Sequence, residues 1–126
     1  SGGNRFEHGN HLVQGRLQNA SGTIAPSDDA LGQRLQLIGI GVDPLATLSA
    51  AQRDTWRALG GESLIIQVPG AVSTNANAWV DVDRTFATDK NSRGWIVAVR
   101  PDKVVLADGA PKEAGAIVDS VAKLLR

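Results

Sequence analysis

The stretch that decides the fold is GWIVAVRPDKVVLADG, which runs from Gly94 to Gly109. It holds two aliphatic runs, Ile96–Val99 and Val104–Leu106, on either side of the polar tetrapeptide Arg-Pro-Asp-Lys. Short runs rich in β-branched residues and separated by turn formers are typical of paired antiparallel strands. The stretch therefore predicts a β-hairpin close to the end of the chain.

Three residues define the turn of this hairpin. Pro101 suits the second position of a type I turn, and Asp102 suits the third. A three-residue hairpin loop then places Lys103 in the left-handed region of backbone space, where glycine is less strained by roughly 1 kcal/mol. We expect Lys103 to adopt that conformation in spite of the mismatch.

Upstream of the hairpin, the chain predicts a strand, a helix and a second strand. Residues 34–42 (RLQLIGIGV) are apolar at odd and even positions, as in a strand covered on both faces. Ser49 and Gln52 have the spacing of a capping box, so we expect a helix to begin at Ser49 and to stop at residues 60–61, which are both glycine. Residues 63–68 (SLIIQV) predict the second strand, and such a unit favours a parallel crossover.

Downstream of the hairpin, residues 111–126 predict a final helix. Pro111 fits its first position. The apolar residues recur at spacings of three and four and form one stripe: Ala114, Ile117, Val118, Val121, Leu124 and Leu125. Between the second strand and the hairpin, residues 79–83 predict a short extended piece, and residues 84–89 predict one or two helical turns.

The first 32 residues predict an N-terminal arm. Residues 1–32 are rich in Gly, Asn and Ser and have only brief apolar spots. Turn formers at residues 19–22 separate two of these spots, so a loose hairpin is expected. The arm has too little apolar surface for a core of its own. We expect it to pack on the domain formed by residues 33–126.

This order of elements is that of an α/β domain with a thioredoxin-like mixed sheet of about four strands, helices on both faces and an extended N-terminal arm. In a thioredoxin the redox Cys-x-x-Cys lies between the first strand and the first helix. Here that place holds DPLATLSAAQ (residues 43–52), and the chain contains no cysteine. Dithiol chemistry is therefore excluded.

Composition narrows the class of protein further. The 126 residues suit one domain, and 13 basic residues cancel 13 acidic ones, so no basic face for nucleic acid is implied. No run approaches the roughly 20 apolar residues of a membrane span, and no secretory signal is seen. We expect a cytoplasmic protein without nucleic-acid or membrane partners. The chain starts Ser-Gly-Gly and has no methionine, so we expect the natural polypeptide to be longer.

Few side chains are candidates for chemistry. The segment EHGNH (residues 7–11) offers two imidazoles and a carboxylate, which can bind zinc, but Gly9 and Asn10 do not favour a fixed geometry. A Ser-His-Asp triad would need His8 or His11 beside a serine, and no Gly-x-Ser-x-Gly occurs. We expect two surface histidines and no catalytic, cofactor-binding or metal-binding residue in this chain.

Two further sets of side chains leave alternatives open. The first set is Asp81, Asp83 and Asp89, and the second is Trp56, Trp79 and Trp95. The aspartates serve either as paired carboxylates of the glycosidase kind or, as we expect, as solvated loop acids. The tryptophans serve as core residues, as subunit contacts or as a stacking platform for a planar ligand, and we favour the core.

Three motifs in order point to a known family. VAVRPDKVV (residues 97–105) and the helix after it are similar to a pattern of strand, Arg-Pro-Asp, strand and amphipathic helix. GNRFEH (residues 3–8) is similar to Gly-x-Arg-x-Pro-His, with Glu7 in place of proline, and SDDALGQRLQLIGIG (residues 27–41) is similar to Ser, Asp and Leu-Gly before a strand. The chain thus resembles the C-terminal domain of FAD-dependent aromatic hydroxylases, the phenol and 3-(3-hydroxyphenyl)propionate hydroxylase group.

The resemblance implies a thioredoxin-like domain that lacks the redox cysteines and forms part of a larger flavoprotein. In that family FAD and substrate bind in the preceding domains, and NAD(P)H reduces the flavin. FAD and NAD(P)H are therefore implied for the parent enzyme and not for this chain. The resemblance also implies a structural and dimerising role, with contacts to the catalytic FAD and substrate domains and to a second copy in a homo-oligomer.

Two other functions stay open. A free-standing thioredoxin-like module would bind a small ligand or peptide with residues 71–78 and the tryptophans. An enzyme that uses Asp or His chemistry would need a cleft in which His8 or His11 meets a carboxylate.

Overall fold

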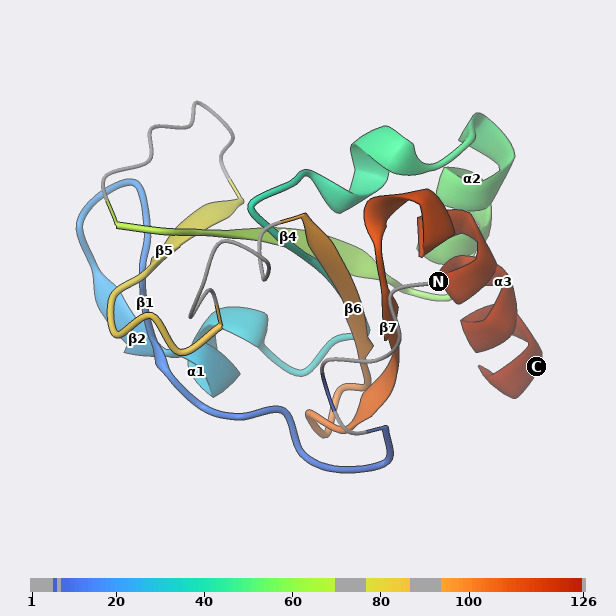
Figure 1. Cartoon of the computed structure of the whole chain (residues 1–126). Coiled ribbons are helices and arrows are strands. Elements are labelled where there is room, and N and C mark those ends of the chain that lie inside the picture. The colour runs from blue at the N-terminus through green and yellow to red at the C-terminus, as the bar shows by residue number, and fades with distance from the viewer. Residues whose placement is uncertain (1–5, 7, 70–76, 87–93, 126) are drawn as a thin grey trace.

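A mixed β-sheet runs through the molecule (Figure 1). The computed structural model describes residues 6, 8–69, 77–86 and 94–125. Within these residues, seven strands form one sheet in the order β2-β1-β5-β4-β3-β6-β7. The strands are β1 (Arg16–Gln18), β2 (Ile24–Pro26), β3 (Gln36–Ile40), β4 (Glu62–Gln67), β5 (Ala78–Asp81), β6 (Trp95–Val99) and β7 (Val105–Gly109). The helices are α1 (Ser27–Leu31), α2 (Ala50–Ala58) and α3 (Ala114–Leu125), with 3₁₀ turns η1 (Pro44–Thr47) and η3 (Pro111–Glu113).

The centre of the sheet is parallel and its margins are antiparallel. Strand β3 runs parallel to β4, and β4 runs parallel to β5. Strand β6 is antiparallel to both β3 and β7, and β1 is antiparallel to both β5 and β2. The predicted mixed α/β class is therefore confirmed.

The sheet has more strands than the four or so that were expected. The arm supplies β1 and β2, and the short extended piece at residues 79–83 supplies β5. The antiparallel pairing of β1 with β2 confirms the loose hairpin expected around residues 19–22. That these short strands join the main sheet through β5 was not predicted, because three or four residues are too few for periodicity to show where a strand pairs. The division between an arm of residues 1–32 and a domain of residues 33–126 stays a prediction.

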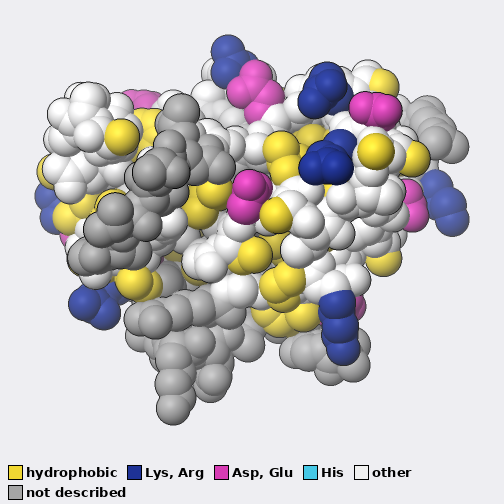
Figure 2. All heavy atoms as spheres, turned by 90° about the horizontal axis from the view of Figure 1, so that it is seen from above, with side chains coloured by type: hydrophobic (Ala, Val, Ile, Leu, Met, Phe, Trp, Pro, Cys, Tyr) yellow, Lys and Arg dark blue, Asp and Glu magenta, His cyan; other side chains and the backbone are white. Residues whose placement is uncertain are grey.

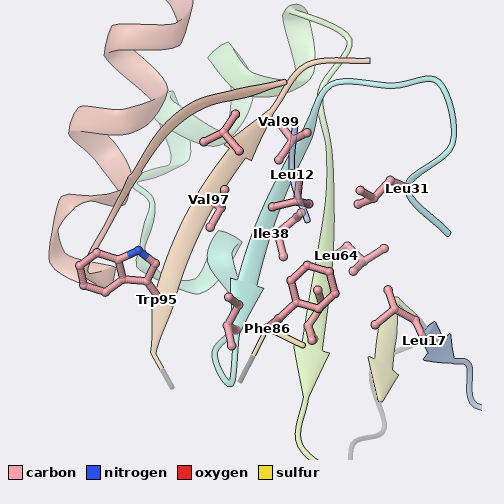
Figure 3. Close-up of a cluster of buried hydrophobic side chains, with 12 residues drawn as sticks. Leu12, Leu17, Leu31, Ile38, Leu64, Phe86, Trp95, Val97 and Val99 are labelled. Carbon is pink, nitrogen blue, oxygen red and sulfur yellow. The ribbon is translucent and has the colours of Figure 1, made fainter. Parts of the chain in front are cut away.

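Both faces of the sheet are covered, and this explains why β3 is apolar at odd and even positions. All five residues of β3 are buried. On the face covered by α2 and α3, the buried cluster is Leu35, Leu37, Leu48, Trp56, Ile96, Ala98, Ala114, Ile117, Val118 and Val121. On the opposite face lie residues of the arm, of α1 and Phe86 (Figure 3); that cluster is Leu12, Leu17, Leu31, Ile38, Ile40, Leu64, Ile66, Phe86, Trp95, Val97, Val99 and Val105.

The hairpin turn forms as predicted. The Lys103 amide donates to the Arg100 carbonyl at 2.8 Å, and Lys103 has a φ of 72°. The lysine side chain explains why glycine is absent here. Its Nζ donates to the carbonyls of Gly32 at 2.5 Å and Pro101 at 2.8 Å, and the residue is buried. The ammonium group therefore ties the arm to the hairpin, which offsets the backbone strain.

Helix α2 begins and ends as predicted. The Ser49 hydroxyl accepts the Gln52 amide, and the Gln52 side chain accepts the Ser49 amide, both at 3.1 Å. Gly60 follows the helix with a φ of 81°, a left-handed conformation that stops it. Among the described helices, none is long and apolar enough to cross a bilayer.

Helix α3 is confirmed, but its apolar stripe is shorter than predicted. The buried residues are Ala114, Ile117, Val118, Val121 and Ala122. Leu124 and Leu125 are 66% and 45% exposed. The helical spacing continues to the end of α3, but the last turn extends past the surfaces that cover the rest of the helix.

The helical turns predicted for residues 84–89 are absent from residues 84–86, and residues 87–89 lie outside the described part. The buried Asp81 carboxylate accepts the amides of Thr85 at 2.9 Å and Phe86 at 2.8 Å. This turn places Phe86 in the core. Conversely, α1 was not predicted, because its five residues are too few to show a helical period.

The two outer strands of the sheet are shielded in different ways from pairing with strands of other molecules. Along β7, the Gly9 amide donates to the Val105 carbonyl at 2.8 Å, and the Val105 amide donates to the Asn10 carbonyl at 2.9 Å. We call residues 8–12, which lie along β7, the strap. Strand β2 on the other side has three residues and ends at Pro26, which has no amide hydrogen to donate.

The hairpin turn makes one prediction. Arg100 donates two hydrogen bonds to Asp102, and these lower the pKa of Asp102 to about 2. Because the folded pKa is depressed, the pair stabilises the fold above the unfolded pKa of about 3.9, and this contribution is lost as pH falls through the folded value. We expect an NMR titration of the Asp102 carboxyl carbon to show that low midpoint, and Arg100→Gln to move it to about 3.9. An ordinary midpoint in the unaltered chain would contradict the pairing.

Candidate functional site

The place of a thioredoxin's redox centre lies between β3 and α2. Here η1 fills it, and its polar side chains serve as helix caps. The Asp43 carboxylate accepts the Leu45 amide at 3.0 Å, and the Ser49 hydroxyl accepts the Gln52 amide at 3.1 Å. Each oxygen is thereby committed to a backbone amide that the start of the helix leaves without a partner. The polar side chains of this segment therefore cap the starts of η1 and α2.

A shallow groove of about 510 Å³ lies beside this segment. Its lining residues come from η1, α2 and the residue before η1: Asp43, Leu45, Ala46, Ala50, Arg53, Asp54 and Arg57. A smaller hollow of about 60 Å³ shares Leu45, Arg53 and Arg57 with it and reaches the start of β4. The groove is lined by charged side chains of both signs and by the apolar side chains of Leu45, Ala46 and Ala50.

A second polar cluster centres on Asp108 in β7. Its side chain is fully buried, and it accepts hydrogen bonds from the Trp95 indole at 2.8 Å and the Phe6 amide at 3.0 Å. His8 Nε2 lies 2.6 Å from the other carboxylate oxygen. A buried carboxylate needs such donors, because an unsatisfied one is strongly unfavourable. The cluster therefore fixes the beginning of the strap against β6 and β7.

The two histidines are not brought together as a metal site. His8 pairs with Asp108, whereas His11 is exposed and forms a β-bridge with Val104. Over the residues that the structure describes, no group of three potential metal ligands occurs, and Glu7 lies outside them. In the same described part, no serine hydrogen-bonds to His8, so the pair lacks the nucleophile of a triad.

The three candidate aspartates have separate environments. The expectation of a solvated loop acid is wrong for Asp81, which is buried at the end of β5 and accepts the amides of the turn that leads to Phe86. Asp83 is exposed and accepts two hydrogen bonds from Arg16, at 2.9 and 2.6 Å, which lower the pKa of Asp83. Asp89 lies outside the described residues. The two described carboxylates are thus committed to a turn and to an ion pair.

Two of the three tryptophans, Trp56 and Trp95, are core residues. Trp56 is 2% exposed in the cluster under the helices and donates to the Glu62 carbonyl at 2.8 Å. Trp95 is 4% exposed on the opposite face of the sheet and donates to Asp108. Trp79 is half-buried and packs against the edge of that second cluster. Residues 71–76 of the other proposed ligand segment lie outside the described part.

A sequence profile of the HcaD C-terminal domain matches residues 9–124. The chain belongs to the HcaD C-terminal domain family. The match covers every described strand, α1, α2 and all but the last residue of α3, and most of the arm. It confirms the resemblance to the C-terminal domain of aromatic hydroxylases.

Curated relatives carry the name 3-(3-hydroxy-phenyl)propionate/3-hydroxycinnamic acid hydroxylase. The relative from Paraburkholderia xenovorans is 29% identical in an alignment of length 124 that covers 90% of this chain and 20% of the relative. Relatives from Escherichia coli are 27% identical over 93% of this chain and 22% of their own length. This chain therefore spans about a fifth of the length of the relatives that it matches.

Solved structures support the fold. A flavin-dependent monooxygenase, PieE, has a TM-score of 0.66 and 22% identity over 94% of this chain and 20% of its own. A thiol peroxidase from Chromobacterium violaceum has a TM-score of 0.65 and 15% identity over 98% of this chain and 88% of its own. The thioredoxin domain of a Bacteroides vulgatus oxidoreductase has a TM-score of 0.62 and 11% identity, with coverage of 96% and 99%. The thioredoxin-like fold is confirmed.

Features of the Asp108 cluster, the hairpin turn and the groove beside η1 are not predicted from the sequence. Asp108 lies in an alternating strand, where nothing signals that its carboxylate points inward. The sequence identifies Lys103 only as a poor turn residue and gives no sign of its bond to the Gly32 carbonyl. Arg53 and Arg57 line the groove, and their spacing of four is the only sequence signal that they share a helix face.

The Asp108 cluster makes a prediction about stability. Asp108→Ala leaves the Trp95 indole and the Phe6 amide without their buried acceptor. We expect it to lower the free energy of unfolding by roughly 3 kcal/mol in urea denaturation followed by tryptophan fluorescence. Asp119→Ala, at an exposed position on α3, is the matched control and should change stability by less than about 0.5 kcal/mol. Equal effects of the two substitutions would show that the cluster does not stabilise the fold.

Proposed function

We propose that this chain is a non-catalytic structural module of a FAD-dependent aromatic-ring hydroxylase. In this proposal the flavin, the nicotinamide cofactor and the substrate bind elsewhere in the longer polypeptide. The module supports the catalytic domains and contacts a second copy of the chain. The family match, with relatives about five times as long, is the observation that carries the proposal.

The bonding of the reactive side chains supports a structural role. Asp43 and Ser49 cap η1 and α2. Asp108 and His8 hold the strap against the hairpin, and Asp81 shapes a turn. Groups of these types act in catalysis when they face a substrate. Here each of them bonds to another part of the same chain.

Flavin binding tests the non-catalytic part of the proposal. When the chain is titrated with FAD, we expect no change in flavin fluorescence and no co-elution of flavin with protein. We also expect no oxidation of NADH or NADPH when an aromatic acid is added. Stoichiometric binding of FAD, or hydroxylation by the chain alone, would overturn the proposal.

A chimeric hydroxylase tests the supporting role. In the Paraburkholderia xenovorans hydroxylase, the matching segment is either deleted or replaced by this chain. We expect the deletion to lower the yield of soluble protein that carries FAD, and the replacement to restore it, because the module supplies packing and no reactive group. Full FAD content and full hydroxylation in the deletion variant would contradict a supporting role.

A further inference from the structure

A buried acceptor in the described part of the chain has no donor. Gln36 is 4% exposed, and its side-chain oxygen Oε1 makes no hydrogen bond. The nitrogen of the same amide donates to the Leu31 carbonyl at 2.8 Å. Turning the amide over would set two acceptors against each other, so the oxygen is the atom that lacks a partner. Buried polar atoms of this kind are in the large majority of cases bonded, either to protein or to an ordered water molecule.

A buried donor with spare capacity lies on the hairpin turn. The charged side chains in Figure 2 reach the surface of the face seen from above, whereas Lys103 is 8% exposed. Its ammonium donates to the carbonyls of Gly32 at 2.5 Å and Pro101 at 2.8 Å. Among the described residues, no carboxylate lies within 4.0 Å of this ammonium. An ammonium group has three protons, so one of them has no acceptor in that part of the chain.

The register of the sheet and two adjacent carbonyls bring these groups to one place. Gln36 lies opposite Val99 of β6, directly before the turn that holds Lys103. The carbonyls that the two side chains bind, those of Leu31 and Gly32, are consecutive in the chain. The spare acceptor and the spare donor therefore belong to side chains that hold the same peptide segment at the end of α1. They do not bond to each other directly.

The hydrogen-bonding capacity of the two groups selects a water molecule as their common partner. The partner must donate to the Gln36 oxygen and accept from the Lys103 ammonium. A chloride ion has no proton to donate, and a metal ion cannot accept and would repel the buried ammonium. Water does both, and buried waters typically make about three hydrogen bonds to groups that the protein leaves unsatisfied. The second lone pairs of the Leu31 and Gly32 carbonyls are further acceptors on the same peptide segment.

We propose that Gln36 and Lys103 bind one buried water molecule, which links Oε1 to Nζ and completes the polar connection between α1, β3 and the hairpin turn. The water supplies the third hydrogen bond of the ammonium, so a buried cation is accommodated here without a carboxylate. The site is formed by this chain alone and does not depend on the catalytic domains of the proposed function. Because the groups that bind it are buried, the water stays bound for longer than the molecule takes to tumble.

Two measurements on the unaltered chain test this site directly. In NOESY and ROESY spectra, we expect cross-peaks between the water resonance and the side-chain amide protons of Gln36. Their signs should be opposite in the two spectra, which distinguishes a long-lived bound water from proton exchange. A high-resolution crystal structure should show one water within hydrogen-bond distance of both Oε1 and Lys103 Nζ. A direct bond between Nζ and Oε1, or an Oε1 without a water, would overturn the proposal.

Variants show whether both side chains hold the same water, because oxygen-17 relaxation dispersion counts long-lived water molecules. We expect Gln36→Met and Lys103→Met each to lose one such water, and the double variant to lose that same one and no more. Gln33→Met and Lys123→Met make the matched changes at exposed positions and should lose none. A count that is unchanged in the folded variants, or a loss of two waters in the double variant, contradicts a shared site. If circular dichroism shows that a variant is unfolded, the spectra and the crystal structure of the unaltered chain decide.

Discussion

A buried carboxylate must be surrounded by hydrogen-bond donors, and the Asp108 side chain meets this constraint by drawing three parts of the chain together. The indole of Trp95 comes from the neighbouring strand, and the Phe6 amide and the His8 ring come from the beginning of the chain. A domain without disulfides has no covalent link to hold so polar an arm. Because leaving the carboxylate unsatisfied is strongly unfavourable, the arm, β6 and β7 are stabilised as one unit.

The rest of the architecture follows from the need to cover a sheet whose central strands are apolar on both faces. Two helices cover one face, and the arm with α1 covers the other. Lys103 adds a second polar link between arm and hairpin through the Gly32 carbonyl. The loss of redox chemistry fits this arrangement, because the segment between β3 and α2 is occupied by caps. What remains there is a shallow groove lined by charged side chains of both signs.

Much of this fold can be predicted from sequence, and the failures have physical causes. The hairpin, the capping box and the long strands have strong local signals, since turn chemistry and periodicity act over a few residues. The turn formers at residues 19–22 predict the hairpin of β1 and β2, but not its place in the main sheet, which depends on pairing with β5. Helix α1 has only five residues, too few to show a helical period. Leu124 and Leu125 continue the helical stripe and are therefore predicted to be buried, but both are exposed. The spacing of apolar residues does not reveal where the surface that covers a helix ends. Two partners of Asp108, the Phe6 amide and the His8 ring, come from about 100 residues away, a distance in sequence that no local pattern spans.

The strap along β7 and the proline at the end of β2 have a consequence for the behaviour of the protein in a crowded cell. The outer strand of a sheet can template the addition of strands from other molecules, and this is a route to insoluble fibrils. In the described part of this chain, β7 is already paired to the strap through Val105, and β2 is short and closes with Pro26. Uncontrolled polymerisation through the sheet is thereby suppressed at both margins.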